Sequence, residues 1–285
     1  SSDLGAFLGM AGGITSDMNY ASLSVGALYN ESFMNGKTKL CQIVFMKAYR
    51  FAFMVLGFFF TVFVSVYFIL PDAFSPEGFN LKNYYPALIF IIPFLIKRAI
   101  GIIFSQAGSI LYATNKPNLI LLFSYLGQIL MILWHSALVL WWKVPQSSQL
   151  GFYFCLLFAG DLLSWIIALI QYIYINKHVF KLRIAWYQTI VAPFLTSSIC
   201  LFLSFGSYLY VYRTLKDATG NFFIALVVFM IIMIFLGFAL YFPLYAFFGG
   251  WDNASIQEFE KVRAMSGPSK PIVNQIFRLS LWAIH

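Results

Sequence analysis

The stretch Tyr84-Tyr-Pro-Ala-Leu-Ile-Phe-Ile-Ile-Pro-Phe-Leu-Ile-Lys97-Arg98-Ala-Ile-Gly-Ile-Ile-Phe104 decides the class of this chain. Apart from one pair of cations it is almost wholly apolar, and it has the roughly 20 residues that cross a bilayer as a helix. Lys97 and Arg98 stand near its middle, where a charge is costly unless it faces protein, water or an anion. The apolar run predicts a membrane-spanning helix, and the two cations predict a functional position on it.

Similar apolar stretches fill most of the 285 residues, at 43–70, 84–113, 118–142, 150–176, 185–212 and 220–248. The composition agrees, since 61% of the residues are hydrophobic and 10% are charged, against about 45–50% and 25% in soluble domains. No strand-like alternation of apolar and polar residues is visible, which argues against a transmembrane barrel. We therefore predict an all-α fold, a polytopic transmembrane helix bundle.

A seventh segment, 4–33, is different in kind. Gly5, Gly9 and Gly13 have the spacing that lets membrane helices approach closely, while the residues from Thr15 to Ser24 are rich in polar side chains, Asp17 among them. We expect a helix buried among other helices, with its second half facing a polar cavity. A flexible N-terminal extension is the alternative.

The net charge of +8 is explained by topology, so a nucleic-acid partner is not required. If the turn between 4–33 and 43–70 is cytoplasmic, twelve cations lie inside and four outside, a bias that places the C-terminus in the cytoplasm. The inner cations are Lys37, Lys39, Lys47, Arg50, Lys116, Lys177, Lys181, Arg183, Lys261, Arg263, Lys270 and Arg278, and the outer ones are Lys82, Lys143, Arg213 and Lys216. We predict a multi-pass protein of the cytoplasmic cell membrane.

Lys97 and Arg98 are the first candidates for substrate binding. Arg pairs with phosphate through two parallel hydrogen bonds and Lys acts as a point charge, so together they suit a phosphate or pyrophosphate. An internal ion pair is the equal alternative, because Asp161 lies at a similar depth within 150–176. Asp161 is also suited to binding a coupling cation or carrying a proton, and Asp17 is a further intramembrane carboxylate with the same options.

Enzymatic chemistry has no visible basis in this sequence. No protease, hydrolase or phosphate-loop motif occurs, and the cysteines Cys41, Cys155 and Cys200 lack metal-ligand spacing. His135 suits a hydrogen-bonded packing role better than a proton relay. We predict a protein that is not an enzyme and that needs no metal and no cofactor.

Two turn sequences resemble those of a known transporter family. Glu31-Ser-Phe-Met-Asn-Gly-Lys37 is similar to the Ser-Glu-Ala-Tyr-x-Asn-Gly-Lys signature of polysaccharide flippases in the MOP (multidrug, oligosaccharidyl-lipid, polysaccharide) superfamily, with Asn30 where those proteins often have Ser. Gly108-Ser-Ile-Leu-Tyr-Ala-Thr-Asn-Lys-Pro117 resembles their Gly-x-x-x-Leu-x-Ala-x-Gly-Lys-Pro turn, with Asn115 in place of Gly and with the first Gly one residue closer to Leu111. Both turns fall on the predicted cytoplasmic side.

The resemblance implies the second lobe of a MATE-like flippase plus two extra helices. Residues 1–180 would be the incomplete lobe, 181–250 the extra helix pair and 251–285 a cytoplasmic amphipathic tail, which either lies on the membrane or packs against the bundle. The first lobe of the same protein is an expected partner, together with membrane lipids. A chain that opens Ser1-Ser2-Asp3, without Met, is expected to be a fragment.

The function implied by the resemblance is the flipping of a lipid-linked oligosaccharide or polysaccharide repeat unit by alternating access, with cavity cations on the pyrophosphate. A cation-coupled multidrug efflux transporter of the same superfamily is the first alternative, and it predicts that acidic groups dominate the cavity. An integral membrane enzyme and a scaffold without transport are further alternatives. The enzyme needs a catalytic cluster that is not visible, whereas in a scaffold the intramembrane charges would be only structural.

Overall fold

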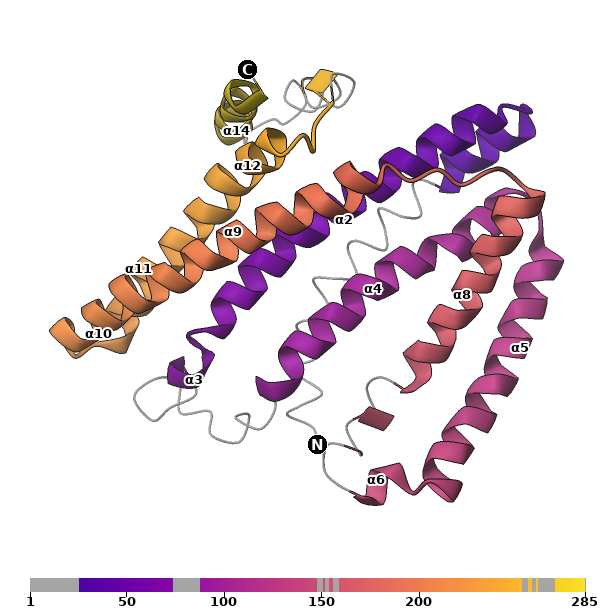
Figure 1. Cartoon of the computed structure of the whole chain (residues 1–285), viewed down its shortest axis with the longest axis horizontal. Helices are drawn as coiled ribbons and strands as arrows, with labels where there is room; N and C mark the ends of the chain where they lie inside the picture. Colours follow the sequence, from indigo (N-terminus) through magenta and orange to yellow (C-terminus); the bar gives the residue numbers. More distant parts are fainter. Residues whose placement is uncertain are drawn as a thin grey trace. The chain divides into compact units, whose positions relative to one another are not determined.

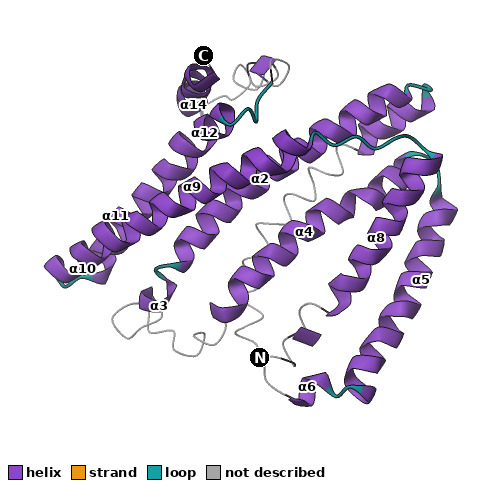
Figure 2. Ribbon diagram, in the orientation of Figure 1, coloured by secondary structure: helices purple, strands orange, loops and turns teal. Residues whose placement is uncertain are grey.

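The computed structural model describes residues 26–73, 88–147, 151, 154–155, 159–252, 256–257, 260 and 270–284. Throughout this part of the chain the regular structure is helical, and no strand occurs (Figure 2). The elements are α2 (Thr38–Tyr67), α3 (Leu70–Ala73), α4 (Leu88–Ala113), α5 (Pro117–Ser136), η2 (Ala137–Trp141), α6 (Val144–Ser147), α8 (Ala159–His178), η3 (Tyr187–Val191), α9 (Ala192–Ser207), η4 (Tyr208–Tyr212), α10 (Arg213–Thr219), α11 (Phe222–Phe235), η5 (Leu236–Tyr241), α12 (Phe242–Phe247) and α14 (Lys270–Ile284). The segments η2 to η5 are π-helical turns, and a further helical stretch covers 26–34.

The predicted all-α membrane bundle is confirmed. Among the described residues, five helices are long and apolar enough to cross a membrane: Thr38–Tyr67, Pro117–Ser147, Ala159–His178, Tyr187–Thr219 and Phe222–Phe247. The remaining predicted span, 84–113, contains α4, a helix of 26 residues. Of the predicted N-terminal helix 4–33, only residues 26–33 lie in the described part, and they are helical.

The chain forms two compact units. The first consists of residues 1–52 and 91–184, and the second of residues 53–90 and 185–285. One boundary falls inside the continuous helix α2, which contributes to both. The predicted division at residues 180 and 250 stays a prediction, because it refers to the lobes of a larger bundle.

The first unit contains an aromatic core. Tyr29, Phe45, Tyr49 and Phe180 are buried, and the ring of Phe45 packs against Tyr49, Tyr172 and Phe180. The hydroxyl groups of Tyr49 and Tyr172 form a hydrogen bond that ties α2 to α8. In the same unit α5 packs along α8, with Gly127 facing the side chain of Ile167.

The second unit is held by buried hydroxyl groups as well as by apolar contacts. Its core contains Met54, Ala192, Cys200, Tyr241 and Tyr245. The hydroxyl of Tyr241 donates to the carbonyl of Met54 over 2.8 Å, and the hydroxyl of Tyr245 donates to the carbonyl of Gln188 over 3.1 Å. Small and hydroxylated residues at such contacts are typical of helices that associate within a membrane.

α14 packs on the end of the last described span. It lies beside α12 (Figure 1), and Ile276, Phe277 and Ser280 are buried while Trp282 is exposed. The tail therefore packs against the bundle with one face, whereas the sequence left bundle packing and membrane-surface binding equally open. The face of α14 that carries Trp282 stays exposed.

Candidate functional site

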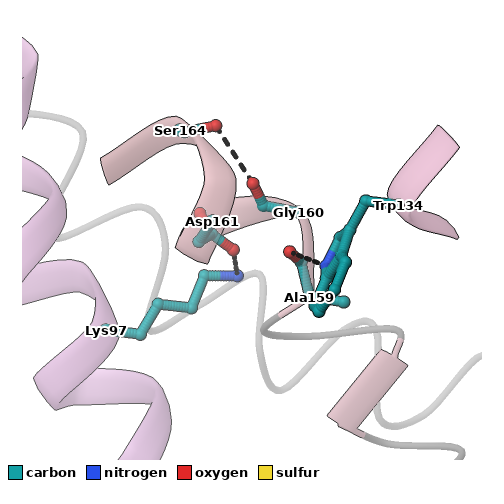
Figure 3. A network of polar contacts seen from close by, with 6 residues as sticks. All are labelled: Lys97, Trp134, Ala159, Gly160, Asp161 and Ser164. Carbon is teal, nitrogen blue, oxygen red and sulfur yellow. Dashed lines mark hydrogen bonds and ion pairs between the residues drawn. The ribbon is translucent and has the colours of Figure 1, made fainter. Parts of the chain in front are cut away.

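An ion pair within the first unit links α4 and α8. Lys97 Nζ lies 2.6 Å from Asp161 Oδ2, and Figure 3 shows the lysine reaching from α4 to the first turn of α8. The side chain of Lys97 is 15% exposed and that of Asp161 is 38% exposed. The carboxylate is therefore the more accessible of the two charges.

Neighbouring hydrogen bonds fix the backbone that presents Asp161. The indole nitrogen of Trp134 on α5 donates to the carbonyl of Ala159 over 3.0 Å, and the hydroxyl of Ser164 donates to the carbonyl of Gly160 over 3.1 Å. Both bonds are drawn in Figure 3. The start of α8 is thus attached to α5, and the position of the carboxylate is defined by three helices.

Asp161 lines a cavity of about 450 Å³ between α4, α5 and α8, which we call the ion-pair cavity. Its polar lining comes from Ser124 and Gln128 on α5, and from Asp161, Ser164 and Gln171 on α8. Ser124 and Gln128 are four residues apart, and the polar residues of α8 recur at helical spacing, so each set occupies one face of its helix. A polar face on an otherwise apolar helix suits a water-filled or substrate-binding cavity.

A second cavity of about 730 Å³, the turn cavity, lies between the helix 26–34 and the C-terminal part of α4. Asn30 and Met34 line it from one side, and Ser109, Tyr112 and Asn115 line it from the other. These residues belong to, or directly adjoin, the two turn sequences Glu31–Lys37 and Gly108–Pro117. The structure thus brings the two turn sequences to one cavity. Residues Gly108 and Ile120 line both cavities.

The two turns end their helices in the same way. Gly36 has φ +67° and Asn115 has φ +55°, both in the left-handed region. In each turn the following lysine donates its backbone N–H to a carbonyl five residues earlier, from Lys37 to Ser32 over 2.9 Å and from Lys116 to Leu111 over 3.1 Å. This pattern is the Schellman cap, in which Gly is the favoured residue and Asn the usual substitute. The replacement of Gly by Asn115 therefore preserves the turn.

The structure places some of the site residues predicted from the sequence, and others lie outside the described residues. The ion pair with Asp161 is present, and its cation is Lys97. The side chain of Arg98 and all of Asp17 lie outside the described residues, and the substrate-binding role of the cations stays a prediction. His135 Nδ1 donates to the carbonyl of Met131 over 2.9 Å, as expected of a hydrogen-bonded packing histidine.

Sequence reasoning missed the polar lining of the ion-pair cavity. Ser124, Gln128, Ser164 and Gln171 are uncharged and were not distinguished from other residues of the apolar spans. Their spacing, four residues in α5 and seven in α8, keeps each pair on one face of its helix and is the signal that reveals them. Within the described ranges, no cluster of three or more His, Cys, Asp or Glu side chains suitable for a metal ion is found.

Comparison with known proteins adds no relative, since no family model, curated protein or solved structure matches the chain. The fold and the cavity at Asp161 define a class, an all-α polytopic membrane protein with polar side chains lining a cavity between its helices. The similarity to polysaccharide flippases remains a prediction that rests on the two turn sequences.

Proposed function

We propose that this chain belongs to a transporter that flips a lipid-linked oligosaccharide or polysaccharide repeat unit across the cytoplasmic membrane by alternating access. The observation that carries the proposal is the ion pair of Lys97 with Asp161, whose carboxylate lines an open cavity between α4, α5 and α8. Charges at this depth are expensive and are kept where they serve a substrate or ion path. The C-terminus is cytoplasmic in this proposal, and the first lobe completes the transport cavity.

The chemistry of Lys97 supports an anionic substrate. An ammonium group binds a phosphate oxygen as readily as a carboxylate oxygen, over about 2.7–2.9 Å. A phosphate that enters the ion-pair cavity beside Asp161 therefore competes with this carboxylate for Lys97. Arg98, the adjacent residue on α4, is the second cation that we assign to the phosphates.

A second candidate is a cation-coupled multidrug efflux transporter. It is favoured by the greater exposure of Asp161, whose side chain is 38% exposed against 15% for Lys97. A cation that arrives through the cavity therefore meets the carboxylate before it meets the lysine. In this alternative Asp161 holds the coupling ion, and Lys97 pairs with Asp161 when no ion is bound.

Translocation in proteoliposomes tests the proposal and separates the two candidates. The full-length protein is compared with its Lys97→Gln, Arg98→Ala and Asp161→Asn variants, using a fluorescent lipid-pyrophosphate oligosaccharide. Loss of a charge-assisted hydrogen bond worth about 1.5–3 kcal/mol should lower translocation by roughly 10- to 100-fold in the first two variants. Asp161→Asn should bind the substrate more tightly, because the competing carboxylate is gone.

The matched control is Lys216→Gln. Lys216 forms an ion pair with Asp72 over 3.4 Å in the second unit, and its side chain is 24% exposed. This variant should translocate the glycolipid like wild type. Wild-type rates in both Lys97→Gln and Arg98→Ala would refute the cation site. Loss of ion-driven dye export in Asp161→Asn, with normal export in Lys97→Gln, would favour efflux.

A further inference from the structure

The turn cavity differs in chemistry from the ion-pair cavity. Among the described residues, its polar lining consists of two amides, Asn30 and Asn115, and two hydroxyl groups, Ser109 and Tyr112, and includes no charged side chain. Amides and hydroxyls both donate and accept hydrogen bonds. Such a lining suits a neutral, hydroxyl-rich ligand better than an ion.

The turn cavity also has an aromatic surface and open space. The side chain of Tyr112 is 75% exposed, so its ring is available to stack on an apolar face of a ligand. A Cβ atom added at Gly26 or Gly108, which both line the cavity, would have no neighbour within 4 Å. The glycines therefore leave room that larger residues would fill. The volume of about 730 Å³ lies within the range of about 300–1,000 Å³ that is usual for ligand pockets.

The two cavities adjoin, because Gly108 and Ile120 line both. Along α4, Gly108 lies roughly 16 Å from Lys97 at a rise of 1.5 Å per residue. A ligand that occupies both cavities must therefore be longer than a single small chemical group. Its charged part would lie beside Asp161 and the paired Lys97, and its uncharged part among the amides and hydroxyls near the turns.

We infer that the turn cavity binds the neutral sugar residues of the transported glycolipid while its phosphates meet Lys97. This inference rests on the proposed function, since it divides one substrate between two adjoining cavities. Sugars share their hydroxyl chemistry with the glycerol and inositol of lipid headgroups. The experiment therefore includes both kinds of ligand.

Glycine variants that fill one cavity at a time provide the test. Gly26→Leu fills the turn cavity alone and Gly101→Leu fills the ion-pair cavity alone. Gly206→Leu, in α9 of the second unit, lines neither cavity, and its Cβ would also have no neighbour within 4 Å. All three are expected to fold, which thermal unfolding in detergent checks against wild type.

Binding of free, uncharged probes is measured on the full-length protein in nanodiscs by saturation-transfer difference NMR. The sugar probes are maltotriose and tri-N-acetylchitotriose, and the headgroup probes are glycerol and myo-inositol. At least one sugar should bind to wild type, and Gly26→Leu should weaken its binding at least about tenfold, a change of about 1.4 kcal/mol. Gly101→Leu and Gly206→Leu should bind the sugar like wild type.

The inference is overturned if neither sugar binds to wild type, or if Gly26→Leu binds it unchanged. Binding of the headgroup probes alone would also overturn it and would assign the cavity to a membrane lipid. The failure of this inference is distinguishable from the failure of the proposed function. If Lys97→Gln loses translocation while sugars do not bind, the transporter stands and the sugar site falls. If sugar binding depends on Gly26 while the wild-type protein translocates no glycolipid, the sugar site stands and the proposed function falls.

Discussion

The hydroxyl of Ser197 donates a hydrogen bond of 3.0 Å to the main-chain carbonyl of Gly57, from α9 to α2. The same carbonyl accepts a second bond of 2.9 Å from the hydroxyl of Thr61. One turn earlier, the carbonyl of Met54 accepts from Tyr241. Close approach of the backbones at Gly57 makes these contacts between helices possible, which is the role of small residues in membrane helix packing.

Replacement of Gly57 by Leu should destabilise the second unit. A Cβ atom at this position would lie 2.9 Å from Ser197 Oγ and 3.3 Å from Pro193 Cβ, and closer still to the Tyr241 hydroxyl. Inserting a large side chain into a packed contact typically costs about 1–3 kcal/mol. Cys200 is buried in the adjacent core, so its labelling by a thiol-reactive dye during heating reports the unfolding of this unit.

That measurement uses a background in which Cys41 and Cys155 are replaced by Ala. The Gly57→Leu variant should label at a lower temperature than the background protein. Gly206→Leu is the control, because it adds the same side chain on α9 where the Cβ has open space. Equal labelling temperatures for the two variants would show that Gly57 does not set the helix spacing.

Exchange of the two charges separates a structural ion pair from a transport site. The variant Lys97→Asp places two carboxylates opposite each other and should lower stability, whereas the double variant Lys97→Asp/Asp161→Lys restores opposite charges and should regain it. Translocation should stay at least about tenfold below wild type in the double variant, because the cation now stands on α8 and no longer beside Arg98. Recovery of both stability and translocation would mean that the pair is only structural.

The turn residues at left-handed positions should respond to substitution according to their φ values. Gly36→Ala places a Cβ at φ +67° and should cost about 1–2 kcal/mol. Asn115→Gly should keep or slightly raise stability, since φ +55° suits glycine better than any other residue. Thermal unfolding in detergent gives both changes. Stabilisation by Gly36→Ala would contradict the Schellman assignment.

Hydropathy predicted which segments form long apolar helices better than where those helices end. The apolar pattern of span 185–212 stops at Tyr212, but the helix continues through α10 to Thr219, because Arg213 to Thr219 are compatible with a helix. It ends where Gly220 adopts φ +62°. Asn221 then caps the next helix by accepting from the N–H of Phe223. The apolar content of a segment indicates whether its surroundings are lipid or water, whereas the ends of a helix depend on local backbone chemistry.

The candidate site could be predicted only where charge made it visible. Lys97 and Asp161 attracted attention because charges are rare in apolar spans, and their similar depth made an ion pair one of the two interpretations left open. The uncharged residues Gln128 and Gln171 carry a weaker signal, since a single amide in a span is tolerated. Their assembly around one cavity depends on how α5 rotates against α8, and no pattern within one helix fixes that rotation.

The docking of α14 should depend on Phe277 and not on Trp282. Phe277 is 4% exposed against the bundle, while Trp282 on the same helix is 80% exposed, so truncation of Phe277 to Ala removes packing worth about 3–5 kcal/mol. A cysteine introduced at the buried Ser280, in a background without the three native cysteines, reports the contact through its labelling rate. The Phe277→Ala variant should label several-fold faster than this background, whereas Trp282→Ala should match it. Equal acceleration by both variants would mean that α14 is held through its exposed face, by the membrane surface and not by α12.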